Sequence, residues 1–162
     1  MNSLTSAVAA VIADPAGRLL LCQQSQGQRL WSLPGGKIQI DESPLHAAVR
    51  DIRAEVGADV SLVELIGLYK LTDGPGLDSS LGEVLIHVFR ARIDGEVTVN
   101  APGLISRLCW HEPADLPGPM TATACAAIDD AVAGRTGVIR TVHRAAAPEF
   151  PDAIEPALAA SN

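Results

Sequence analysis

Two carboxylates spaced four residues apart, Asp51 and Glu55, are the side chains of this sequence best suited to chemistry. They lie in the stretch 44–56, where apolar residues recur at three- and four-residue steps, a pattern typical of an amphipathic helix. Residues four apart on a helix lie one turn apart on the same side. Carboxylates bind divalent cations that in turn bind phosphate oxygens, so the pair is compatible with a site for a cation and a phosphorylated ligand; the alternative is a solvated helix face.

A loop rich in glycine comes directly before this predicted helix. It contains Pro34, Gly35 and Gly36, which preclude regular structure and allow the backbone to approach a ligand closely. Pro44 suits the first turn of the helix, and Gly57 suits its C-terminal end. The loop and the helix therefore form one candidate unit for phosphate and metal chemistry.

The stretch 36–58 resembles the signature box of the Nudix family. That box runs Gly, five residues, Glu, seven residues, and then Arg-Glu-aliphatic-any-Glu-Glu-any-Gly-aliphatic. Three positions of this chain depart from it, namely Asp51, Ala54 and Ala58. The positions that agree with the box are Gly36, Glu42, Arg50, Ile52, Glu55 and Gly57.

The resemblance implies an α/β (α+β) fold in which a mixed β-sheet is sandwiched between helices. It also implies a hydrolase that cleaves a diphosphate bond in a nucleoside diphosphate derivative or a related small phosphorylated metabolite. In this family, glutamates of the box helix hold Mg²⁺ or Mn²⁺ against the diphosphate while an activated water attacks phosphorus. The resemblance therefore implies that Asp51 and Glu55 are catalytic and bind the metal, with the backbone carbonyl of Gly35 as a further ligand.

Four other positions of the box have structural roles by the same resemblance. Glu42 and Arg50 are expected to form an ion pair that joins the loop to the helix, so the loop–helix geometry of the family is expected here. Gly36 and Gly57 are expected to support the same scaffold at its two ends.

The departures from the box weaken the predicted metal site. Asp51 keeps the negative charge of the family's Glu but is one methylene shorter, and Ala54 supplies no oxygen. Many Nudix proteins carry acidic residues in the strand that leads to a tryptophan equivalent to Trp110, but this chain has Arg107 and Leu108 there. A substitute carboxylate would have to come from elsewhere, with three candidates: Glu83, Glu96 and Glu112.

Several functional questions stay open at this level. The general base could be Glu55, Glu83 or Glu112. The incomplete box also fits a Nudix-fold module that binds a nucleotide or a protein partner without turnover. A non-hydrolytic enzyme on the same scaffold is a third hypothesis, which rests on analogy of fold alone.

Outside the box, the aromatic and basic residues allow more than one interpretation. Trp31 is a candidate for stacking on a substrate base, but it and Trp110 fit core packing equally well. Arg135, Arg140 and Arg144 lie near a predicted late strand over 136–142. These arginines could meet phosphate or a second subunit, or they could form a solvated face.

Composition narrows the class of partner. The net charge is −7, whereas a protein that binds polynucleotides through their phosphates usually presents a basic face. We therefore expect a small phosphorylated or nucleotide substrate and no polynucleotide. No apolar run approaches the ~18 residues of a membrane span, so we expect a cytoplasmic protein without a membrane partner. The resemblance is compatible with a homodimer.

The chain is expected to contain one Nudix domain over 1–144 and an Ala/Pro-rich, flexible tail over 145–162. Apolar runs at 7–13 and 18–24 around a turn at 14–17 predict a hairpin. A loop over 71–82, long enough to act as a lid, separates two of the further strands. The remaining predicted elements are strands over 60–70, 83–93, 97–99 and 105–110 and a helix over 122–133.

Overall fold

A computed structural model describes residues 4–74 and 82–144 of the 162-residue chain. The tail predicted over 145–162 lies outside the described residues, as does most of the lid predicted over 71–82. Eight strands and two helices follow one another along the described chain. They are β1 (Leu4–Ile12), β2 (Leu19–Gln24), β3 (Trp31–Ser32), β4 (Gly35–Lys37), α1 (Pro44–Val56), β5 (Asp59–Asp73), β6 (Glu83–Asp94), β7 (Ile105–His111), α2 (Ala122–Val132) and β8 (Val138–Arg144).

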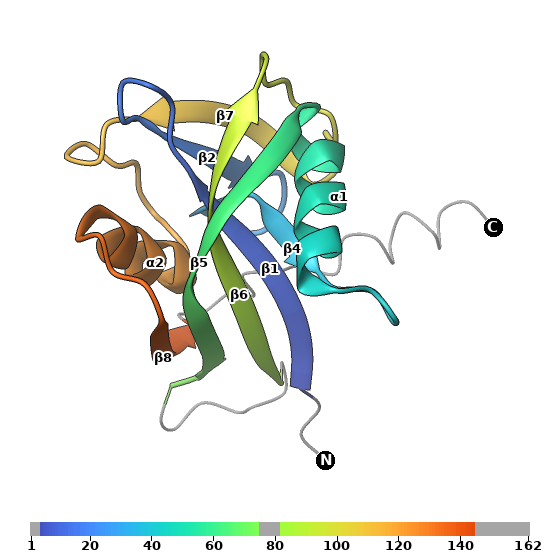
Figure 1. Cartoon of the computed structure of the whole chain (residues 1–162), viewed down its shortest axis with the longest axis vertical. Helices are drawn as coiled ribbons and strands as arrows, with labels where there is room; N and C mark the ends of the chain where they lie inside the picture. Colours follow the sequence, from blue (N-terminus) through green and yellow to red (C-terminus); the bar gives the residue numbers. More distant parts are fainter. Residues whose placement is uncertain (1–3, 75–81, 145–162) are drawn as a thin grey trace.

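The strands divide into two sheets. The larger sheet has the order β4-β1-β6-β5-β8 and is mixed, because β1 pairs with β6 and β5 with β8 in parallel, while β6 and β5 are antiparallel. The smaller sheet has the order β3-β2-β7 and is antiparallel. Figure 1 shows α1 and α2 on opposite sides of the larger sheet. The predicted mixed sheet between helices is thereby confirmed.

Each helix covers its own apolar core on one face of the larger sheet. On the α1 face, Ile52 and Val56 pack with Val8, Ala10 and other residues of β1. On the α2 face, a separate cluster joins the helix to the alternate residues of β1, β5 and β6; it includes Ala124, Ala127, Ile128, Ala9, Tyr69 and Ile86. The continuous apolar run of β1 therefore reflects a strand that is buried on both faces.

Three predictions about strands were wrong. Gly35 and Gly36, which were expected to preclude regular structure, belong to the strand β4, which pairs with β1. The runs at 7–13 and 18–24 are not a hairpin within one sheet, because β1 and β2 enter different sheets and share only the bridge between Ala13 and Leu19. The stretch 97–99 is not a strand either. Its backbone instead runs to the end of α1, where Thr98 N–H donates to Val56 O at 2.9 Å and Asn100 N–H donates to Glu55 O at 2.9 Å. These bonds satisfy helix carbonyls that have no partner within the helix.

The three arginines near β8 bind acids of the same chain. Arg140 and Arg135 donate to the fully buried carboxylate of Asp130, with Arg140 Nε at 2.8 Å and Arg135 Nη1 at 3.0 Å. Arg144 donates to Asp73 Oδ1 at 2.8 Å. These hydrogen bonds therefore fasten α2 and β5 to the edge strand β8, while the side chains of Arg135 and Arg140 stay about half exposed.

In the described part of the chain, neither helix has the length and apolar character needed to cross a bilayer.

Candidate active site

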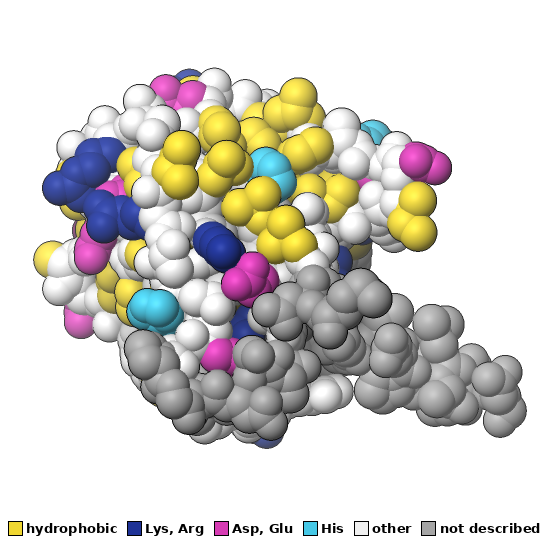
Figure 2. All heavy atoms as spheres, turned by 90° about the horizontal axis from the view of Figure 1, so that it is seen from below, with side chains coloured by type: hydrophobic (Ala, Val, Ile, Leu, Met, Phe, Trp, Pro, Cys, Tyr) yellow, Lys and Arg dark blue, Asp and Glu magenta, His cyan; other side chains and the backbone are white. Residues whose placement is uncertain are grey.

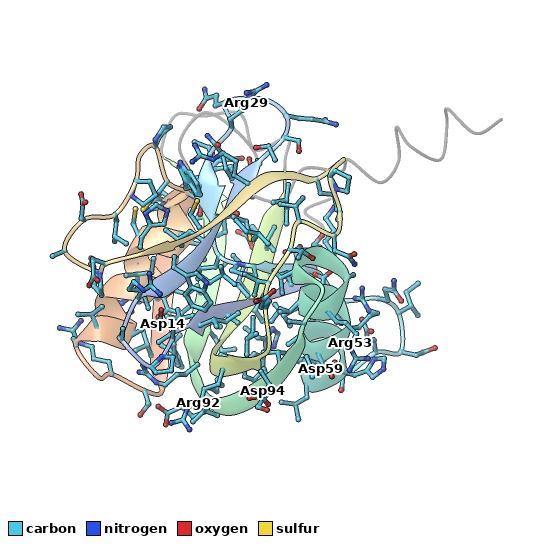
Figure 3. The ribbon with its side chains drawn as sticks, turned by 90° about the horizontal axis from the view of Figure 1, so that it is seen from above. Asp14, Arg29, Arg53, Asp59, Arg92 and Asp94 are labelled. Carbon is cyan, nitrogen blue, oxygen red and sulfur yellow. The ribbon has the colours of Figure 1, made fainter. Side chains whose placement is uncertain are left out.

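The helix α1 is capped at both ends by the residues that its sequence predicts. Ser43 is the N-cap, and its hydroxyl accepts the backbone N–H of His46 at 3.1 Å. At the other end Gly57 adopts a left-handed conformation with φ 67°, which glycine reaches without steric cost. Arg53 in the last turn pairs with Asp59 at the start of β5 at 2.7 Å, and the two side chains lie together in Figure 3. The helix is thus fixed in position and in rotation.

Burial of one side of α1 turns both candidate carboxylates toward the glycine strand β4. Ile52 and Val56 are fully buried, and the neighbouring Glu55 is only 8% exposed. The backbone N–H of Gly35 donates to Glu55 Oε2 at 3.2 Å. A Cβ at position 36 would collide with the carboxylate of Asp51. The backbone of β4 therefore lies directly against the helix carboxylates, and it is at position 35 that a Cβ would collide with backbone atoms, those of Val8 and Ala9.

The environment of these two carboxylates disfavours their charged forms. Burial raises the pKa of Asp51 to about 6, although Arg50 opposes this rise from 3.6 Å. Burial also raises the pKa of Glu55 well above its usual value, and repulsion from Asp51 adds to the effect while the Gly35 N–H opposes it. Asp51 Oδ2 is buried and has no hydrogen-bond partner. The pair is therefore a buried acidic site whose negative charge Arg50 offsets only in part.

These features fit a divalent cation. An ion such as Mg²⁺ prefers oxygen ligands and keeps several waters, so two carboxylates and a main-chain carbonyl can hold it. A cation beside Asp51 Oδ2 would supply the missing partner of that atom and would favour the deprotonated forms of both acids. The residues that would hold it are Asp51 and Glu55, with the carbonyl of Gly35 as the further ligand that the resemblance implies.

The loop before α1 is held by a fully satisfied ion pair. Arg50 Nε donates to Glu42 Oε2 at 2.6 Å, and Arg50 Nη2 donates to Glu42 Oε1 at 2.8 Å and to the Lys37 carbonyl at 3.2 Å. The ring of His46 adds a contact of 2.8 Å to Glu42. Hydrogen bonds from Arg50 lower the pKa of Glu42 to about 2. This arrangement joins loop and helix and leaves Glu42 charged at neutral pH.

The structure does not bring a third acidic ligand to the pair. Within residues 4–74 and 82–144, no group of three or more His, Cys, Asp or Glu side chains is arranged to hold a metal ion. Glu83 lies 3.3 Å from Lys70 in an ion pair, and Ala54 is exposed. None of Glu83, Glu96 and Glu112 therefore completes the site in the part of the chain that the structure describes.

The two tryptophans have different surroundings. Trp31 is 5% exposed and packs edge-on against the ring of His111, with centroids 5.2 Å apart. The guanidinium of Arg107 lies 5.6 Å from the centre of the same Trp31 ring. Trp110 is half-buried against the core on the α1 side. Trp31 thus has the environment of a core residue. Arg107, which stands in the strand where many Nudix proteins carry acidic residues, packs against Trp31.

One neighbour of the site has no signal in the sequence. Cys22 on β2 is buried, and the pKa of its thiol is raised well above the usual range by burial and then by the charges of Glu55 and Asp51. Cys22 thus lies close enough to the carboxylate pair for their charge to act on its thiol. The tertiary packing of the smaller sheet, which contains β2, brings Cys22 to this position. No spacing in the sequence reveals this proximity.

Comparison with known proteins agrees with the fold and with the box. The model of the family described as NUDIX domain matches residues 3–130. A crystal structure of a MutT NUDIX hydrolase from Burkholderia pseudomallei is similar, with a TM-score of 0.70 and 26% identity, covering 79% of this chain and 98% of that one. The chain therefore belongs to the Nudix family, and it is a hydrolase enzyme.

Two curated relatives show how far the sequence similarity extends. A MutT-like protein from Streptomyces ambofaciens is 29% identical over 134 residues, covering 83% of this chain and 80% of the relative. A CTP pyrophosphohydrolase from Escherichia coli (strain K12) is 36% identical over 66 residues, covering 39% of this chain and 49% of the relative. This chain thus matches only about half the length of the second relative.

Proposed function

We propose that this protein hydrolyses a diphosphate bond in a nucleoside diphosphate derivative, with a nucleoside triphosphate as the first substrate to test. Asp51 and Glu55, together with the carbonyl of Gly35, would hold Mg²⁺ or Mn²⁺. The observation that carries the proposal is the buried, unpartnered Oδ2 of Asp51 beside Glu55, in a site whose negative charge Arg50 offsets only in part. The name of the relative from Escherichia coli, a CTP pyrophosphohydrolase, supports a nucleotide substrate.

A bound divalent cation would polarise phosphoryl oxygens and lower the pKa of a water molecule. The chain itself orients the acids: the Gly35 N–H holds Oε2 of Glu55, and Glu42 holds the guanidinium of Arg50 close to Asp51. Of the three candidate bases, Glu55 is favoured because it lies in the site beside Asp51, whereas Glu83 is paired with Lys70. Its carboxylate could take up a proton from water as phosphorus is attacked.

A second candidate function has its own support in the structure. Ala54 supplies no oxygen, and the described residues offer two carboxylates at this site where a complete box would offer more. A weakened cation site is compatible with a module that binds a nucleotide without hydrolysing it. Turnover distinguishes the two functions.

The deciding experiment is a panel of nucleoside triphosphates, sugar nucleotides and dinucleotides, assayed with Mg²⁺ and separately with Mn²⁺. The proposal expects release of pyrophosphate, phosphate or a monophosphate from at least one of them, and no release when EDTA is present. Saturable nucleotide binding without turnover for the whole panel would instead establish the binding module. Titration of the active substrate with each ion would then identify the preferred metal.

A further inference from the structure

A cleft of about 940 Å³ lies at the end of the larger sheet where β1 and β6 finish. It is formed by the turn between β1 and β2 together with the ends of β6, β7 and α2. Figure 3 looks onto this end of the molecule, and Figure 2 shows the opposite end, where hydrophobic side chains gather around a histidine. Sites for small organic molecules usually measure about 300–1,000 Å³. The cleft is therefore large enough for an organic ligand.

The cleft is separate from the candidate active site. Two arginines of β6, Arg90 and Arg92, line it. The residues that directly precede them, Phe89 and Ala91, are buried in the core on the α1 face. Successive side chains of a strand point to opposite faces, so both arginines point to the α2 face of the larger sheet. The carboxylate pair belongs to α1, on the other face, and the cleft is thus a second candidate site.

Three arginines line the cleft and have guanidinium groups available for a ligand. Arg92 is exposed, and its side chain makes no ion pair or hydrogen bond with another described residue. Arg18 of the turn donates through Nε to Asp14 Oδ2 at 2.7 Å. Arg90 donates through Nε to Glu64 Oε1 at 2.9 Å. Because both ion pairs use Nε, Nη1 of each side chain has no partner within the described part of the chain.

The charges in the lining favour an anionic ligand. Besides the three arginines, the cleft is lined by two acidic residues, Asp14 and Asp94, so it has an excess of positive charge in a chain of net charge −7. Guanidinium groups bind phosphate and carboxylate oxygens through paired N–H donors. A phosphate ester offers three terminal oxygens and up to two negative charges, whereas a carboxylate offers two oxygens and one charge. Three arginines from two separate elements therefore suit a phosphate ester better.

Apolar side chains form another part of the lining. Val132, the last residue of α2, is 61% exposed although it is aliphatic. Trp110 of β7 and Pro15 of the turn also line the cleft. Apolar walls with a few charged groups are the usual composition of a small-molecule site. The ligand that fits best therefore has an apolar body in addition to its phosphate.

We propose that this cleft binds a small phosphate ester. Arg92, Arg18 and Arg90 hold the phosphate, and the apolar body of the ligand lies against Val132 and Trp110. Binding here needs no divalent cation, because the guanidinium groups supply the positive charge. The assignment is independent of the hydrolase activity.

Binding of phenyl phosphate to the full-length chain in EDTA tests the proposal. EDTA removes the cations through which Asp51 and Glu55 would bind phosphate, and phenyl phosphate has no diphosphate bond to hydrolyse. Isothermal titration calorimetry should show saturable binding that Arg92→Gln weakens by about tenfold or more. Arg29→Gln is the matched control, because it replaces an exposed arginine between β2 and β3. It should leave the affinity unchanged.

Two further probes separate the parts of the ligand. Inorganic phosphate should bind more weakly than phenyl phosphate, and Val132→Ser should weaken phenyl phosphate binding severalfold with little effect on inorganic phosphate. Backbone amide NMR shifts caused by phenyl phosphate should map to residues 90–95 and 131–132. Absence of saturable binding, an equal loss of affinity in the Arg29 control, or shifts confined to other elements would overturn the assignment. Benzoate binding as tight as that of phenyl phosphate would overturn the phosphate ester as the ligand class.

Discussion

Two buried acidic sites of this protein differ in how their charge is balanced. Asp130 on α2 is fully buried, yet it accepts hydrogen bonds from Tyr69 Oη at 2.8 Å and from Arg135 and Arg140. Burial alone would raise its pKa, but these donors outweigh burial and the pKa is lowered. The pair Asp51 and Glu55 on α1 has few donors, and burial raises both pKa values.

The difference separates a structural acid from a candidate catalytic one. A buried carboxylate with a full set of donors gains little from a cation, because its charge is already stabilised. A buried pair without such donors gains most when a cation binds. We therefore expect substitutions of Asp51 or Glu55 to reduce turnover and substitution of Asp130 to reduce stability.

The largest effect is expected for Glu55→Gln. This change removes a carboxylate of the proposed metal site while the side chain keeps its size, so turnover should fall by about 100-fold or more. The protein should keep its stability, since the replaced acid is disfavoured by burial. Steady-state kinetics with Mg²⁺ and urea unfolding measure the two quantities. An unchanged kcat would show that the metal site lies elsewhere.

Asp130→Asn should show the reverse. The amide leaves two arginines facing a neutral group, and loss of this buried network should lower the free energy of unfolding by about 2–4 kcal/mol. The folded fraction should keep its turnover, because Asp130 is remote from the box. Urea unfolding and activity per folded molecule check the prediction. A large loss of turnover without loss of stability would break the contrast between the two sites.

The pH dependence of stability provides a smaller effect. Without divalent cations, an unfolded aspartate releases its proton near the ordinary pKa of 3.8, whereas folded Asp51 releases it at about 6. Between these values the folded protein binds more protons, so its free energy of unfolding falls as pH rises. We expect a fall on the order of 2 kcal/mol from Asp51. Urea unfolding in EDTA from pH 4 to 8 measures it, and Asp51→Asn should flatten the slope.

The smallest effect is expected for Ala54→Glu, which restores a carboxylate that the box of the family has. Residue 54 is exposed and directly precedes Glu55 on α1. An added carboxylate should tighten Mn²⁺ binding severalfold, through one more oxygen ligand. Leu45→Glu, at an exposed position of the same helix, serves as the control for added negative charge. Equal tightening in both variants would attribute the gain to charge alone, and no change in either would place residue 54 away from the ion.

Much of the fold follows from local sequence signals. The box helix is predicted to within a residue because its cap, its apolar period and its terminal glycine all agree. The hairpin at 7–24 fails because a turn signal does not specify which sheet each strand joins. The stretch 97–99 fails because its backbone bonds to α1, a contact that depends on tertiary structure.

Some features of the candidate active site can likewise be predicted from the sequence, and others depend on tertiary structure. The resemblance that the box residues carry implies the carboxylate pair and the Glu42–Arg50 ion pair without any coordinates. Their burial, the raised pKa of Asp51 and the proximity of Cys22 come from the packing of distant strands. The loss of a third acidic ligand is visible in Ala54, but only the structure shows that no other described residue replaces it.

Binding of Mn²⁺ to the full-length protein, followed by electron paramagnetic resonance, tests the central claim most directly. The account predicts saturable binding that Asp51→Asn and Glu55→Gln each weaken by about tenfold or more, whereas Asp130→Asn leaves it unchanged. Absence of saturable binding, or binding that neither α1 substitution affects, would contradict it.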